Sequence, residues 1–265
     1  MTYLNLDQIA QIAPSVINQD HSPKLSGIYK HIPTTEVIDI LGKNGWGVTK
    51  VLQSNTRKGN EGNIPYKKHM LRFRNMNDTI SKEIGDTFPE IVMTNSHDGT
   101  SSFKFHVGLF RLVCSNGLVI ADQTFSNLKI NHKGFEKSKI IEIINETTVR
   151  VPDVVGKVQK MMGKEMSMTQ QYDFAMDAYV NNWGLNEDDV VDVNQLLKVR
   201  RDEDRGNDLW SVFNRVQENI VKGGVLTIKP KGEGKFRRSR SRQIKSIDKN
   251  IQVNKMLWSL SESLI

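Results

Sequence analysis

The sequence has little cysteine and no long apolar run, and both absences narrow the class of protein. The one cysteine among 265 residues, Cys114, cannot form an internal disulfide or supply a thiolate metal site. No stretch approaches 18 uninterrupted apolar residues, which excludes a membrane-spanning helix. The first residues do not combine a basic start with an apolar run, so we expect no secretory signal. These absences predict a protein of the reducing cytoplasm that has no membrane partner.

Motifs for catalysis are also scarce. The six histidines are scattered without an i, i+4 pair, so no zinc-binding helix is expected. The string GEGK at 232–235 lacks the first glycine and the Ser or Thr of a phosphate loop. Acidic clusters at 187–192 and 202–208 could hold the metal ions of a nuclease, but the arginines among the second favour an ion-pair network. We therefore predict no enzymatic activity, no bound metal and no cofactor.

The net charge of +7 is concentrated in one segment. Between Lys222 and Lys245, nine basic residues are opposed by Glu233 alone. Because the segment is also rich in Gly and Ser, it predicts a mobile basic loop over about 226–246. Such a loop either binds nucleic-acid phosphates or serves solubility, and the local density of one sign favours phosphate binding. The candidate DNA-binding residues of this loop are Lys229, Lys231, Lys235, Arg237, Arg238, Arg240 and Arg242.

A second basic stretch, residues 57–74, has six basic residues and one acidic residue, Glu61. A period of two from Tyr66 to Arg74 predicts a strand with an aromatic ring and cations on one face. Single-stranded nucleic acid needs cations for its phosphates and flat rings for its unstacked bases. The alternative is an ordinary exposed sheet face. The candidate DNA-binding residues here are Tyr66, Lys67, Lys68, Arg72 and Arg74, with Trp46 or Phe236 as additional stacking platforms.

The order of periodic segments predicts an α+β fold. Strand patterns cluster in residues 1–130 and helical patterns in 131–265, with Pro152 separating helices at 136–149 and 154–162. We expect a single domain over 1–265, in which an antiparallel or mixed sheet from the N-terminal half is packed by helices from the C-terminal half. The basic loop is expected to project from this domain.

The last predicted helix ends in an apolar tip. This tip either docks into the core or forms a short partner-binding tail. The candidate partner-binding residues are Trp258, Leu260, Leu264 and Ile265.

Several long strings carry a resemblance to known proteins. They are HIPT at 31–34, KHMLRFR at 68–74, TNSHDG at 94–99, GLFRLVCSNGL at 108–118, RGNDLWSVFNRVQEN at 205–219 and NKMLW at 254–258. The chain resembles, nearly end to end, a phage- and plasmid-related family catalogued as a domain of unknown function. In length and setting it is also similar to the single-stranded DNA-binding proteins of podophages that encode a virion RNA polymerase. That resemblance implies roles in phage DNA replication and recombination, and in late transcription through host RNA polymerase.

We therefore expect a non-enzymatic, sequence-tolerant single-stranded DNA-binding protein in the host cytoplasm, with host RNA polymerase or replication proteins as further partners. Three alternatives stay open: a single-strand annealing recombinase, an interaction factor that acts on host defence or host RNA polymerase without DNA, and a metal-dependent nuclease. The sequence does not specify the oligomeric state. The strings at 97–99 and 205–219 suggest turn geometry and a packed, capped helix, respectively.

Overall fold

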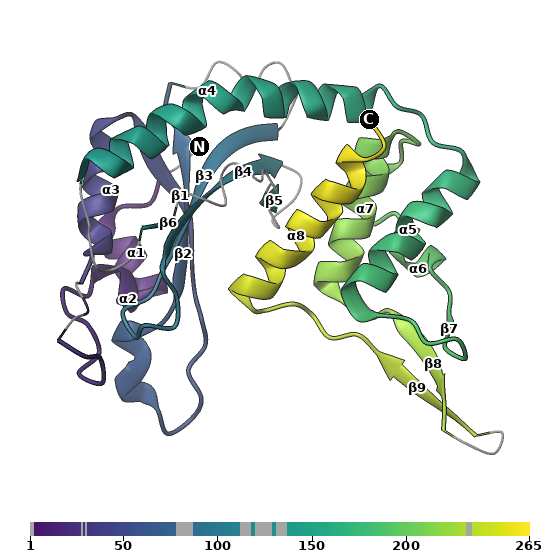
Figure 1. The fold of residues 1–265 in the computed structure, drawn as a ribbon, viewed down its shortest axis with the longest axis horizontal. Helices are drawn as coiled ribbons and strands as arrows, with labels where there is room; N and C mark the ends of the chain where they lie inside the picture. Colours follow the sequence, from purple (N-terminus) through teal and green to yellow (C-terminus); the bar gives the residue numbers. More distant parts are fainter. Residues whose placement is uncertain are drawn as a thin grey trace. The chain divides into compact units, whose positions relative to one another are not determined.

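The computed structural model describes residues 3–27, 29, 31–77, 87–111, 118–119, 129–130, 137–231 and 235–265. Cys114 and Glu233 lie outside the described residues. The chain divides into two compact units, 1–152 and 153–265, whereas the sequence led us to expect a single domain. The boundary falls at Pro152, within the long helix α4 (Lys137–Met162). Each unit is described by itself (Figure 1).

The first unit is built on an antiparallel sheet of order β1-β2-β3-β4-β5, with β6 also paired to β4. The strands are β1 (Trp46–Gln53), β2 (His69–Asn75), β3 (Thr87–Asn95), β4 (Phe103–Arg111), β5 (Leu118–Val119) and β6 (Lys129–Ile130). The N-terminal half therefore supplies the large sheet and the C-terminal half most of the helices. The predicted α+β class is confirmed.

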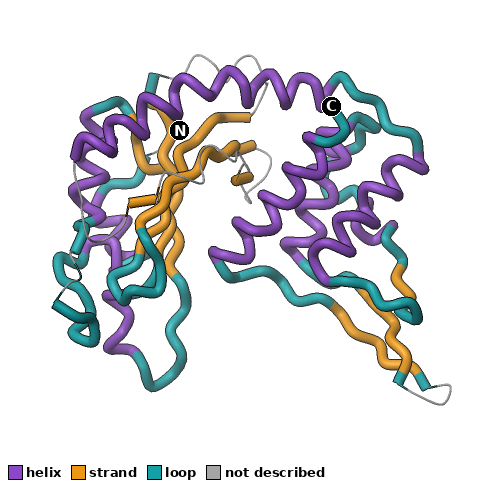
Figure 2. The backbone as a smooth tube through the Cα atoms, viewed as in Figure 1, coloured by secondary structure: helices purple, strands orange, loops and turns teal. Residues whose placement is uncertain are grey.

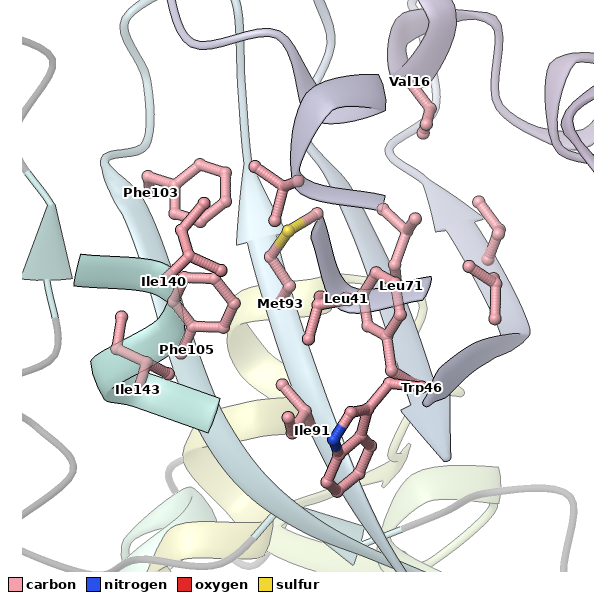
Figure 3. Packing of buried hydrophobic residues seen from close by; sticks show 14 of the residues in the cluster. Val16, Leu41, Trp46, Leu71, Ile91, Met93, Phe103, Phe105, Ile140 and Ile143 are labelled. Atoms are coloured by element: carbon pink, nitrogen blue, oxygen red, sulfur yellow. The ribbon is translucent and has the colours of Figure 1, made fainter. Parts of the chain in front are cut away.

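One face of this sheet carries the hydrophobic core. Alternate residues of β1 to β4 point to this face because side chains in a strand alternate. The rest of the cluster comes from helices α1 (Leu6–Ile12), α2 (Pro14–Ile17) and α3 (Thr34–Lys43), from the start of α4, and from Ala13 and Ile32 outside these helices. Figure 3 shows Leu41 of α3 and Ile140 of α4 beside the strand residues Met93 and Phe105. Trp46 is buried in the same cluster, so it is not an exposed stacking platform.

The second unit is organised around one buried helix, α7 (Leu209–Lys222). Every residue from 209 to 221 is buried. Its neighbours are α5 (Met168–Trp183), α6 (Asn194–Leu197) and α8 (Ile247–Glu262). The side chain of Asp208 caps the helix by accepting from the Ser211 N–H at 2.9 Å, and Gly223 ends it. The structure confirms the packed, capped helix that the sequence suggests for 205–219.

Gly223 is required by geometry. Its φ is +71°, and a Cβ there would lie 2.6 Å from the backbone of Arg242. Glycine therefore permits the close approach of the chain that leads from the basic segment into α8.

Two expectations about secondary structure are wrong, one for the basic segment and one for the helices around Pro152. The basic segment is not a loop: β8 (Leu226–Pro230) and β9 (Phe236–Arg240) form an antiparallel hairpin, to which β7 (Val190–Val191) adds a third strand. Figure 2 shows this hairpin extending from the helices of the second unit. Helix α4 also continues through Pro152, where the sequence led us to expect a break between two helices.

Candidate nucleic-acid interface

The register of the β8–β9 hairpin (residues 226–240) decides which side chains share a face. Leu226 pairs with Arg240, Ile228 with Arg238, and Pro230 with Phe236. Since cross-strand partners point to the same side, the first face holds Phe236, Arg238 and Arg240. The second face holds Thr227, Ser239, Lys229 and Arg237. The hairpin is closed by a backbone hydrogen bond of 2.8 Å from the Lys231 N–H to the Lys235 carbonyl.

The second face is anchored to the helices. Thr227 is buried, and its Oγ1 lies 2.6 Å from the hydroxyl of Tyr179 in α5. The first face consequently points away from α5. Phe236 on that face is 65% exposed, so most of its ring is accessible to a ligand. We call the first face, with Phe236, Arg238 and Arg240, the outer face.

The hairpin carries a dense positive charge. Lys231, Lys235, Arg237, Arg238, Arg240 and Arg242 are all exposed, and none of these six forms an ion pair among the residues that the structure describes. Such a concentration of like charges suits a polyanionic ligand. Charges also protect edge strands from pairing with other chains, and β9 is an edge strand. Protection alone does not explain the exposed ring of Phe236, because an apolar ring at an edge promotes association.

The first unit places Tyr66 differently from the sequence-based expectation. Tyr66 ends a short 3₁₀ helix (Glu61–Tyr66), and β2 begins only at His69. Tyr66, Lys67 and Lys68 are partly buried, and Lys67 Nζ lies 3.7 Å from Asp98 Oδ2. The prediction that Tyr66 and Lys68 lie on the strand is wrong, because Tyr66 belongs to the 3₁₀ helix and β2 starts one residue after Lys68.

Arg72 and Arg74 are buried, not available to phosphates. Arg72 Nη1 lies 2.9 Å from Glu90 Oε2, and Arg74 Nη2 lies 2.9 Å from Glu90 Oε1. The exposed fractions of the two arginine side chains are 1% and 4%. Arg74 also lies over the ring of Phe88, 4.4 Å from its centroid. The expectation that these two residues bind DNA is therefore corrected: in this structure they neutralise a buried glutamate on the sheet face opposite the core cluster.

Sequence reasoning missed a buried network of histidines in the first unit. His69 Nδ1 lies 2.8 Å from Ser15 Oγ and 3.1 Å from the Lys67 carbonyl, and Nε2 lies 2.9 Å from Thr34 Oγ1. A carbonyl oxygen only accepts, so Nδ1 carries the proton and Nε2 accepts from Thr34. Burial lowers the pKa of His69 to about 4. The neutral ring thus ties β2 to α2 and α3.

Two further rings extend this network. The His97 ring lies 5.2 Å from the His69 ring and 4.4 Å from the His31 ring, measured between centroids. Asp98 and Gly99 form the turn expected at 97–99: Asp98 Oδ1 accepts from the Thr100 N–H at 3.0 Å, and φ of Gly99 is +75°. Within the described parts of the chain, no three His, Cys, Asp or Glu residues could hold a metal ion. The network is best understood as a structural junction.

The family model described as "Domain of unknown function (DUF932)" matches residues 24–258. The chain belongs to the DUF932 family. It is similar to two Escherichia coli K12 proteins, UPF0380 protein YafZ and UPF0380 protein YfjQ, at 34% and 33% identity over 262 residues. Each match covers 99% of this chain and 92% of the other protein. No solved structure matches the chain. The matched range of this DUF932 protein contains both the hairpin and the histidine network.

The carboxylates of the acidic cluster at 202–208 take part in a helix cap and in ion pairs with arginines. Asp208 caps α7, and Asp202 Oδ1 accepts from Arg205 Nε at 2.8 Å. Arg201 Nη2 forms an ion pair with Glu218, and Arg201 Nε lies 3.7 Å from Asp204 Oδ2. These contacts match the ion-pair network that the sequence favours over a metal site.

The C-terminal tip divides between core and surface. Trp258 is fully buried in α8, so its assignment to a partner-binding tail is corrected to the core. Leu260 is partly buried, whereas Leu264 and Ile265 are exposed. Among the residues that the structure describes, no helix combines the length and apolar character needed to cross a bilayer.

Proposed function

We propose that this DUF932 protein binds single-stranded DNA, without sequence preference, through the outer face of the β8–β9 hairpin. The observation that carries the proposal is the exposed ring of Phe236 on the same face as Arg238 and Arg240. An exposed ring stacks on an unpaired base, and guanidinium groups bind the flanking phosphates. Alternate residues of a strand lie about 7 Å apart, so the ring and the two cations follow one extended strand of DNA.

Two arguments favour single strands over duplex DNA, one from the second unit and one from the duplex itself. Helix α7 is buried along its length, so it cannot enter a major groove as a recognition helix does. A base-paired duplex also hides the base faces on which Phe236 would stack. A two-stranded ribbon can enter a major groove, so a duplex belongs in the test as a competitor.

The composition of the outer face supports a lack of sequence preference. Its described side chains are Leu226, Ile228, Pro230, Phe236, Arg238 and Arg240. They offer aliphatic groups, one ring and two guanidinium groups assigned to phosphates, and no amide or carboxylate that would read a base edge. Stacking and phosphate contacts tolerate any sequence.

The biological setting follows from the resemblance to podophage single-stranded DNA-binding proteins. We place the protein in the host cytoplasm, acting without catalysis in phage DNA replication and recombination, and in late transcription with host RNA polymerase. Tyr66, Lys67 and Lys68 are kept as a second contact surface in the first unit, because all three are partly accessible.

The proposal is tested by fluorescence anisotropy with a labelled 30-nucleotide strand of mixed sequence and with its duplex. The double variant Arg238→Ser/Arg240→Ser removes two phosphate contacts. It should flatten the slope of log affinity against log salt by about 1.4, which is about 25-fold in affinity at 0.1 M salt. The matched control, Arg57→Ser/Lys58→Ser, removes two exposed cations from the first unit and should leave both quantities nearly unchanged.

Equal losses in the two variants would contradict a site on the hairpin. Duplex binding as tight as single-strand binding would contradict the choice of ligand.

A further inference from the structure

Lys229 differs from the other cations of the hairpin because its ammonium group forms an ion pair with the carboxylate of Asp189. Its Nζ lies 2.9 Å from Asp189 Oδ2. Asp189 immediately precedes β7, which pairs with β8. The same Oδ2 accepts from the backbone N–H of Asn186 at 3.3 Å and from its Nδ2 at 3.2 Å. The carboxylate is therefore fixed in place by its own loop.

The two partners differ in access to solvent. The side chain of Asp189 is 2% exposed and that of Lys229 is 42% exposed. The hydrogen bond to Lys229 lowers the pKa of Asp189, and the same bond raises the pKa of Lys229. Both groups are therefore charged at neutral pH. The ammonium group is therefore accessible from the solvent side to a second anion, which would compete with the Asp189 carboxylate for it.

The register explains why Lys229 needs an anion. Lys229 lies directly opposite Arg237 on the second face of the hairpin. Like charges directly opposite each other destabilise a strand pair. The carboxylate of Asp189 neutralises one of them. A phosphate would do the same, since both anions accept from an ammonium group at about 2.7–2.9 Å.

We propose that Asp189 is an internal competitor of DNA phosphate. Lys229 lies on the second face, so a DNA strand bound to the outer face reaches it by continuing around the edge strand β9. In the free protein the Asp189 carboxylate occupies the position on Lys229 that a phosphate of this strand takes in the complex. This inference rests on the proposed single-stranded DNA binding and identifies a residue that sets its affinity and salt dependence. Binding at Lys229 exchanges one anion for another, so Lys229 contributes less than the exposed arginines do.

The experiment compares two adjacent substitutions with the same change in net charge. Asp189→Asn frees Lys229, whereas Asp188→Asn alters an exposed residue that forms no ion pair within the described segments. With the same labelled strand, Asp189→Asn should steepen the salt slope by about 0.7 and tighten binding about 5-fold at 0.1 M salt. Asp188→Asn should change affinity by less than about 2-fold, because exposed charges are screened.

A double-variant cycle identifies Lys229 as the cation that is released. Adding Lys229→Ala to Asp189→Asn should abolish the gain in affinity. A gain that persists, or a gain of equal size in Asp188→Asn, would overturn the proposal. Weaker binding by Asp189→Asn would also overturn it, since Asp189 would then serve only to anchor the hairpin.

A single variant that leaves Asp189 intact supplies an independent test. Lys229→Ala should weaken binding less than about 2-fold, whereas Arg238→Ala should weaken it about 5-fold at 0.1 M salt. Equal losses would overturn the proposal even if Asp189→Asn disturbed the hairpin. If the wild-type protein does not bind single strands, the proposed function fails. If it binds and these variants do not differ, only the role of Asp189 fails.

Discussion

Replacing Phe236 by alanine separates base stacking from charge. The ring is 65% exposed and lies opposite Pro230 on the outer face, so its removal leaves the core intact. Stacking on an aromatic side chain contributes about 1–3 kcal/mol per base, so Phe236→Ala should weaken single-strand binding about 5- to 150-fold. The salt slope should not change, because no phosphate contact is lost. The free energy of unfolding should change by less than about 0.5 kcal/mol.

Fluorescence anisotropy at several salt concentrations measures both quantities. Phe236→Trp should bind at least as tightly as the wild type, because a flat ring remains. Phe236→Leu keeps apolar volume without a ring and should behave like the alanine variant. Near-normal binding by Phe236→Leu would refute stacking, and a flatter slope in Phe236→Ala would show that the substitution disturbs the neighbouring arginines.

Three further predictions concern the first unit. Tyr66→Ala should weaken single-strand binding by about 1–3 kcal/mol if a base stacks there, while Tyr66→Phe binds normally; unchanged anisotropy in both removes Tyr66 from the site. The pKa of His69 is lowered from 6.5 to about 4, so the unfolded chain takes up a proton first as the pH falls. Urea unfolding should therefore show stability falling by about 3 kcal/mol between pH 6.5 and pH 4, and a His69→Asn variant that retains this loss would contradict the assignment. Glu90→Ala leaves two buried guanidinium groups without their carboxylate and should cost about 3–5 kcal/mol in the same assay, whereas a loss below 1 kcal/mol would show that the pair is not buried in solution.

Local patterns in the sequence were sufficient for the fold class and for the packed, capped helix in 205–219. The cap could be expected because capping depends on neighbouring residues alone, and in the structure Asp208 caps the start of α7. The hairpin could not be predicted in the same way. Its composition is dominated by basic residues, glycine and serine, but a small sheet needs little burial when β7 pairs with β8 and the Tyr179 hydroxyl hydrogen-bonds Thr227.

The candidate site was predicted only in part, because several of its contacts join residues that are distant in the sequence. A period of two correctly placed Arg72 and Arg74 on one face of β2, but Glu90, which buries them, comes from another strand. The histidine network likewise joins His31, His69 and His97 from separate segments. The spacing of residues in the sequence predicts neither the ion pairs with Glu90 nor the histidine network, since both depend on the tertiary fold. The concentration of charge at 222–245 needed no such information and marked the basic segment, although the sequence predicted a loop there and the structure has a hairpin.

Photo-crosslinking to single-stranded DNA tests the central claim most directly. The wild-type protein is irradiated with an oligothymidylate strand at 0.1 M salt and cleaved after acidic residues, which releases the peptide 234–248 that contains Phe236. Mass spectrometry should find the nucleotide on this peptide, and Phe236→Ala should remove most of the signal. Crosslinks confined to peptides of residues 1–152, or a signal unaffected by Phe236→Ala, would contradict binding through the outer face of the hairpin.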